Sequence, residues 1–248
     1  MIRVTGLVKH LIIINVIMFV ATLTIGNGMF YNLFAMHFPE NEAFKPWQIL
    51  THMFMHGGAD MNNFSIMHIL FNMFALWMFG TPVEQNLGSK RFMFIYISAG
   101  LGAVALQVGY YYFKYLPMEA QALNLGATHE QIIEVFKDGK VFTAIGQEFN
   151  EIYYASMVGA SGCIMGILVA FGMMNPNAEL MLIFLPIPIK AKYFIPGIIL
   201  LDLISGVTGS SFFSPSNTAY FAHVGGALTG FIIMWYWKKT QFNRNRWD

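Results

Sequence analysis

Apolar residues occur along the chain in six long stretches separated by shorter polar ones. The stretches lie at 7–25, 68–83, 92–113, 155–174, 193–206 and 219–237. A helix needs about 20 mostly apolar residues to cross the hydrocarbon core of a bilayer, with a range of roughly 17–25. The pattern predicts an all-α membrane protein in which one domain, 1–248, forms a bundle of six transmembrane helices.

Two lysines decide where the fifth helix begins. The apolar run from 180 to 204 has Lys190 and Lys192 near its middle. Each lysine at the centre of a bilayer would cost about 2.5–3.5 kcal/mol. We therefore expect 180–189 to lie at the membrane interface and the helix to begin near Tyr193.

The composition supports a membrane protein and excludes other classes. Charged residues make up 11% of the chain, against about 25% in soluble domains, so lipid must solvate much of the surface. A net charge of +1 gives no basic footprint for nucleic acid. The single cysteine, Cys163, cannot form an internal disulfide.

The distribution of lysine and arginine predicts the orientation. Cytoplasmic loops carry an excess of these residues. Of the 14 lysines and arginines, all but Lys45, Lys114, Lys137 and Lys140 lie on the side that holds both termini. We expect both termini to be cytoplasmic and, since the N-terminus resembles no transit peptide, the membrane to be the inner membrane of a bacterium.

The loops on the other side differ in character. The long first outer loop, 26–67, contains few charges and is expected to lie in the interface. The acidic loop 114–154 contains a short amphipathic helix at 130–137, which we expect to be a surface decoration. The loop 205–218 is rich in glycine and serine, so we expect it to be mobile and to admit substrate beside the fifth helix.

Four polar residues of the predicted helices lie at a similar depth. His68 and Asn72 are near the start of the second helix, Ser161 is six residues into the fourth, and His223 is early in the sixth. At 1.5 Å per residue, all four lie roughly 0–10 Å below the outer helix ends. Polar groups in hydrocarbon are functional candidates because lipid penalises them.

Small residues below Ser161 and His223 would let their helices approach. Gly162 and Gly166 in the fourth helix, and Gly226 and Gly230 in the sixth, form pairs of the small-xxx-small type. Close helices could bring the hydroxyl within hydrogen-bond reach of the imidazole, the arrangement of an activated nucleophile. His68 and Asn72 share one helix face and could donate to a developing oxyanion.

Four motifs together resemble the rhomboid family of intramembrane serine proteases. They are HILFN from His68, GTPVEQNLG from Gly80, GASG from Gly159, and AHVGGALTG from Ala222. The resemblance implies a dyad of Ser161 and His223, an oxyanion hole of His68, Asn72 and the Ser161 backbone amide, and glycine support from Gly159, Gly162, Gly226 and Gly230. It further implies cleavage of membrane-anchored proteins near the outer face, with lipid and transmembrane substrates as partners and no cofactor or metal. The sequence indicates no oligomeric state.

The chain departs from the family pattern at two places. Gln48 follows Trp47 where many members have arginine, which removes a known type of anchor from the first outer loop. Met165 stands where members often have tyrosine or phenylalanine against the histidine, so His223 is expected to be held more loosely. Glu84 is expected to act as a structural cap or as a partner between loops.

Other interpretations are weaker. His52 and His56 could form a metal site with His68, but no carboxylate or cysteine completes it, and we expect loop hydrogen bonds instead. Asp202 could orient His223 as a third member, although a structural hydrogen bond or a protonated acid is favoured. An inactive rhomboid-like protein would lack the serine or the histidine. A proton-coupled transporter would need more carboxylates within the membrane.

Overall fold

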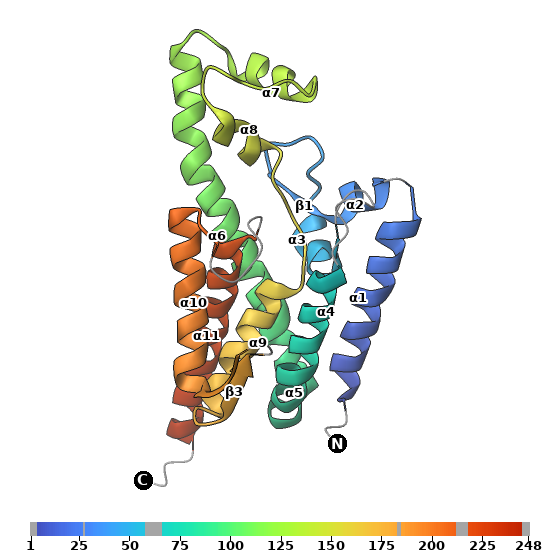
Figure 1. Cartoon of the computed structure of the whole chain (residues 1–248), viewed down its shortest axis with the longest axis vertical. Coiled ribbons are helices and arrows are strands. Elements are labelled where there is room, and N and C mark those ends of the chain that lie inside the picture. Colours follow the sequence, from blue (N-terminus) through green and yellow to red (C-terminus); the bar gives the residue numbers. More distant parts are fainter. Residues whose placement is uncertain (1–3, 27, 58–65, 183–184, 212–217, 245–248) are drawn as a thin grey trace.

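The chain forms a bundle of helices in the computed structural model, which describes residues 4–26, 28–57, 66–182, 185–211 and 218–244. The beginning of α1 and the end of α11 lie at the same end of the bundle (Figure 1). The long helices are α1 (Gly6–Thr24), α4 (Ile66–Ala75) continuing through the π-helical η3 (Leu76–Gly80) into α5 (Thr81–Leu87), α6 (Ser89–Asn124), α9 (Ser161–Met174), α10 (Ala191–Thr208) and α11 (Tyr220–Arg244).

Membrane-spanning length is reached by several of these helices. The segments Gly6–Thr24, Ile66–Leu87, Ser89–Asn124 and Ala191–Thr208 are long and apolar enough to cross a bilayer. The helix α9 is apolar but only 14 residues long, and α11 has 25 residues. The prediction of an all-α membrane bundle is confirmed. The predicted stretch 68–83 is part of a longer helix, and 219–237 continues as helix to Arg244.

The fourth predicted helix begins later than expected. Residues 155–160 are not helical: β2 (Ser156–Met157) pairs antiparallel with β1 (Met36–His37) of the first loop. Gly159 then adopts φ +122°, in the region that favours glycine. Because this turn separates strand from helix, Ser161 is the first residue of α9, and the prediction that it lies six residues into a helix was wrong.

The third helix continues well past the expected end at 113. Since α6 reaches Asn124, the first part of the predicted loop 114–154 is helical. The predicted amphipathic helix is confirmed as α7 (His129–Lys137), which begins with a capping box between Thr128 and Gln131, and α8 (Gln147–Tyr153) follows. Figure 1 shows both short helices beside the outer end of α6.

A second hydrophobic core forms around that outer end, and we call it the outer cluster. Aromatic side chains dominate it, and several are fully buried. The interpretation of α7 as a surface decoration was therefore wrong, because its Ile132 and Phe136 belong to this core. The members are Phe38, Tyr115, Ala122, Ile132, Phe136, Phe149, Ile152 and Tyr153.

The interfacial segment before the fifth helix is a β-hairpin. The strand β3 (Glu179–Leu182) pairs with β4 (Leu185–Lys190), and α10 begins at Ala191, slightly earlier than the expected start near Tyr193. Lys190 and Lys192 thus lie at the end of the helix, as the cost of burying them in lipid requires. At the other end α10 reaches Thr208, beyond the expected 206, and 212–217 of the predicted mobile loop lie outside the described residues.

Close backbone contact joins α9 to α11. A Cβ atom on Gly226 would lie 2.0 Å from the Gly162 carbonyl oxygen, and one on Gly230 would lie 2.6 Å from the Gly166 Cα. Side chains larger than hydrogen therefore do not fit at these positions. The packing fixes the two helices that carry Ser161 and His223 at short range.

Glu84 caps the first helix, as expected. Its carboxylate accepts hydrogen bonds from the backbone N–H groups of Leu7 at 3.2 Å and Val8 at 3.0 Å, and from the hydroxyl of Thr5. It also accepts one from the Ser89 hydroxyl at 2.7 Å. One buried carboxylate on α5 thereby joins this helix to the starts of α1 and α6.

Candidate active site

Ser161 and His223 are in hydrogen-bond contact. Ser161 is the first residue of α9, and His223 lies in the first turn of α11. The distance from Ser161 Oγ to His223 Nε2 is 2.9 Å. The side chain of His223 is 15% exposed, so most of it is buried but part of it is accessible to solvent. The arrangement can pass the hydroxyl proton to the imidazole.

A carboxylate occupies the other side of the imidazole. The distance from Asp202 Oδ2, on α10, to His223 Nδ1 is 2.9 Å, and the Asp202 side chain is 9% exposed. Three helices thus contribute one hydrogen-bonded series from Asp202 through His223 to Ser161. The sequence allowed this contact with His223 but favoured a structural hydrogen bond or a protonated acid, and the structure places Asp202 against His223.

His68 lies beside the turn that precedes Ser161. A Cβ atom on Gly159 would be 2.9 Å from His68 Nε2 and 3.8 Å from Ser161 Oγ, so both side chains approach the same face of this glycine. The His68 ring also faces His56, with centroids 5.1 Å apart. The structure therefore brings His68 close to the pair of Ser161 and His223.

Asn72 lies one turn below His68 and is 7% exposed. Its side-chain amide donates to the His68 carbonyl oxygen at 2.8 Å. An amide carries two N–H hydrogens, so this bond leaves one of them for another acceptor. Cys163 is 1% exposed and lies in the main core, as expected of a packing residue.

The first outer loop supports the turn at Gly159. The His52 carbonyl oxygen accepts a hydrogen bond from the Gly159 N–H at 3.0 Å, and His52 Nδ1 is 2.9 Å from the Gln48 carbonyl oxygen. Gln48 is fully buried, and its amide donates to the Ala43 carbonyl at 2.9 Å and accepts from the Lys45 N–H at 3.0 Å. Gln48 therefore organises the loop without an arginine. Sequence reasoning missed this role, although a lone amide between apolar residues was its signal.

Burial favours the neutral form of the two loop histidines, His52 and His56. Burial lowers the pKa of His52 to about 4 and that of His56 to about 3. Among the residues that the structure describes, no group of three or more His, Cys, Asp and Glu side chains could hold a metal ion. The hydrogen bond of His52 to Gln48 fits the expected loop role.

Comparison with known proteins identifies the domain. The model of the Rhomboid domain family matches residues 43–240. Among curated proteins, the human presenilin-associated rhomboid-like protein, mitochondrial, is 30% identical over 72% of this chain and 35% of its own length. Yeast rhomboid protein 1, mitochondrial, is 22% identical over 73% of this chain and 41% of its own length.

A bacterial relative matches over a shorter region. The rhomboid protease GlpG of Salmonella paratyphi A is 35% identical over 35% of this chain and 29% of its own length.

The chain spans about a third of the length of the first curated relatives that it matches. The family match includes both Ser161 and His223. The chain belongs to the rhomboid family.

Proposed function

We propose that this protein is an intramembrane serine endopeptidase in which Ser161 is the nucleophile and His223 is the general base. The observation that carries the proposal is the 2.9 Å hydrogen bond between Ser161 Oγ and His223 Nε2. Hydroxyls are poor nucleophiles until a neighbouring base removes the proton. Membership of the rhomboid family supports the same activity.

The reaction follows from this geometry. His223 Nε2 takes the proton as Ser161 Oγ attacks the scissile carbonyl, and the resulting imidazolium then protonates the leaving amine. A water molecule, deprotonated by the same nitrogen, releases the acyl group from the serine. The site needs access to water for this second step, and the partial exposure of His223 is consistent with that need.

The oxyanion would be stabilised by groups around the start of α9. The first N–H groups of a helix have no carbonyl partner within the helix, and Ser161 is the first residue of α9. His68, beside Gly159, and the remaining amide hydrogen of Asn72 would complete the oxyanion hole. Donors already aimed at the developing charge lower the barrier without reorganisation.

The substrates we propose are membrane-anchored proteins, cut near the membrane face opposite the two termini. The start of α9 lies toward that face of the bundle (Figure 1). On the distribution of lysine and arginine we propose that both termini lie in the cytoplasm, and we propose the inner membrane of a bacterium as the location. Several relatives are named as mitochondrial, and the shared domain accommodates either membrane.

Labelling with a fluorophosphonate tests the proposal. The wild-type protein in lipid should be labelled at Ser161 and should cleave a transmembrane substrate, and Ser161→Ala should do neither. His223→Ala should lose nearly all labelling. Ser156→Ala is the matched control, because this hydroxyl lies in β2 and bonds Tyr31 at 2.8 Å. Equal labelling of Ser161→Ala and wild type would overturn the assignment.

A further inference from the structure

We propose that Asp202 is a positioning residue that holds His223 in the tautomer and orientation needed for catalysis, so that the site works as a series of three groups. This inference rests on the proposed function. Its starting point is the pair of 2.9 Å contacts that place the His223 ring between Asp202 and Ser161.

The proposal assigns the proton to one ring nitrogen. With Asp202 as an ionised carboxylate, which only accepts hydrogen bonds, Nδ1 carries the proton and faces Asp202. Nε2 then has a free lone pair toward Ser161, as a general base requires. Once Nε2 takes the serine proton, the carboxylate also stabilises the imidazolium, in the way an aspartate does in soluble serine proteases.

Two features of the chain support a role for Asp202 in holding the His223 ring. Met165, one turn after Ser161, is a flexible side chain with no flat ring to fix an imidazole. Asp202 is 6% exposed as a whole residue, in a helix that is otherwise strongly apolar. A buried carboxylate in lipid is costly unless it is paired, and His223 is the partner that the structure gives it.

The variant Asp202→Asn tests this role because it keeps the shape and can reverse the tautomer. The asparagine amide can donate to Nδ1, which would place the proton on Nε2 and remove the base. We expect turnover to fall on the order of 10³- to 10⁴-fold with KM nearly unchanged. Asp202→Glu, which restores a carboxylate, should recover part of the rate. Ser205→Ala is the control, since Ser205 is also buried on α10.

A spectroscopic readout separates positioning from a merely structural role. In protein labelled with ¹⁵N at histidine, the wild type should show His223 protonated at Nδ1, and Asp202→Asn should show the proton at Nε2. Loss of thermal stability with the wild-type tautomer and wild-type turnover of the folded protein would overturn the inference. The proposed function would stand even if the inference on Asp202 failed, provided that the wild type cleaves its substrate and Ser161→Ala does not.

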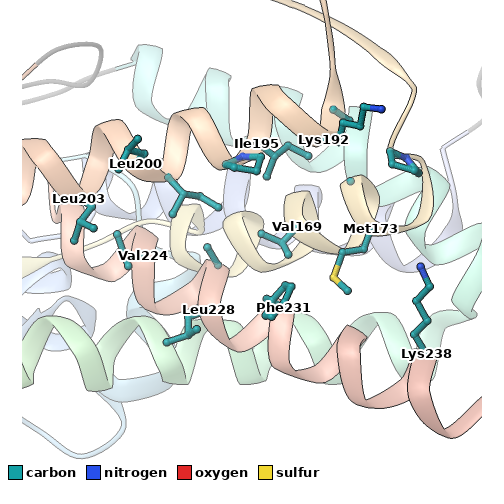
Figure 2. Close-up of a pocket in the computed structure, with 16 residues that line it drawn as sticks. Val169, Met173, Lys192, Ile195, Leu200, Leu203, Val224, Leu228, Phe231 and Lys238 are labelled. Carbon is teal, nitrogen blue, oxygen red and sulfur yellow. The ribbon is translucent and has the colours of Figure 1, made fainter.

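An independent observation concerns a groove on the lipid-facing side of the bundle. A cavity of about 660 Å³ lies between α9, α10 and α11, and its walls are almost entirely apolar (Figure 2). Val169 on α9, Ile195 on α10 and Phe231 on α11 line it. Figure 2 shows Lys192 and Lys238 toward the same end of the cavity but on opposite sides of it, at the end of the bundle that holds both termini.

Neither lysine at this end, Lys192 nor Lys238, has an acidic partner in salt-bridge contact among the described residues. Lys192 Nζ lies 5.2 Å from the centre of the Tyr193 ring. An apolar groove that ends in two lysines at the membrane boundary complements a lipid with an anionic headgroup, and basic pockets between transmembrane helices bind such headgroups.

We infer that the groove binds an anionic phospholipid, with one acyl chain between α10 and α11 and the phosphate between Lys192 and Lys238. Native mass spectrometry with phosphatidylglycerol tests this. The double variant Lys192→Gln, Lys238→Gln should bind about 10- to 30-fold more weakly than wild type. The matched pair Lys190→Gln, Lys239→Gln removes equal charge at the same end and should bind as wild type does.

Further binding measurements identify the kind of molecule that the groove holds. Phosphatidylcholine should bind the wild type more weakly, because its ammonium group meets the lysines, and inorganic phosphate should not compete, because it has no acyl chain. Leu228→Trp, which fills the groove and keeps both lysines, should also weaken lipid binding. Equal loss in the two lysine pairs, or equal binding of both lipids by wild type, would overturn the assignment.

Discussion

At the scale of single residues, the site depends on one backbone angle. Gly159 at φ +122° ends the strand that enters from the outer loop and starts the helix that begins with Ser161. Its N–H is held by the His52 carbonyl, and its missing side chain makes room for His68. The position of the nucleophile therefore depends on a residue that has no chemistry of its own.

Gly159→Ala should abolish most activity. The new methyl group would lie 2.9 Å from His68 Nε2, and the alanine would have to keep a φ that L residues avoid. A displacement of about 1 Å at a catalytic group can cost 10²-fold in rate, so we expect turnover to fall at least that much. Gly126→Ala is the control, because Gly126 has φ +96° but nothing within 4 Å of the new methyl group. Similar losses in both variants would attribute the effect to backbone strain alone.

Asn72→Ala should lower turnover about 10²- to 10³-fold with KM nearly unchanged, the cost of losing one oxyanion donor. Steady-state kinetics on a transmembrane substrate and a thermal midpoint measure the two effects. Asn86→Ala is a matched control, since Asn86 makes the same bond to the carbonyl four residues earlier, at 2.8 Å, but on an exposed surface. An Asn72→Ala protein that unfolds early yet turns over normally while folded would make Asn72 purely structural.

At the scale of elements, hydrophobic length predicted which segments are helical but not where each helix ends. The pattern treated 155–174 as one stretch because it contains no charged residue, whereas Gly159 and the pairing of β2 with β1 keep the first six residues out of the helix. It ended the third helix at 113 because polar residues increase there, whereas aromatic packing in the outer cluster keeps α6 helical to Asn124.

The candidate site was predictable to the extent that motifs are local. GASG and AHVGG each place one group, and both groups meet in the structure. The contact of Asp202 with His223 was considered from the sequence but not favoured, because the two residues lie on different helices and no local spacing relates them. The role of Gln48 was not predicted, because its bonds reach carbonyl groups across the first loop.

The cap that Glu84 provides for α1 predicts a loss of stability without a loss of chemistry. Glu84→Gln removes the charge from several hydrogen bonds, and a charged bond contributes about 1.5–3 kcal/mol. In a protein of this size the thermal midpoint should fall by roughly 3–12 °C. Turnover well below that midpoint should match wild type. Glu134→Gln, at an exposed position of α7, should change neither quantity, and an unchanged midpoint in Glu84→Gln would contradict the capping role.

At the scale of the whole molecule, the orientation is open to direct measurement. In a Cys163→Ser background, Lys140→Cys between α7 and α8 should react with an impermeant thiol reagent added outside intact bacterial cells. Asn177→Cys, before the β3–β4 hairpin, should react only after lysis. Both positions are exposed. The reverse pattern would place the active site toward the cytoplasm.

The length of α6 has a consequence for the order in which parts of the molecule unfold. At 36 residues it measures about 54 Å, well beyond a hydrocarbon core of about 30 Å. Its inner part packs against α9 and α11, and its outer part carries Tyr115 and Ala122 of the outer cluster. Amide hydrogen exchange should therefore divide along this single helix into two cooperative units. The outer unit would open first, while the membrane-embedded half of α6 keeps its amide protons.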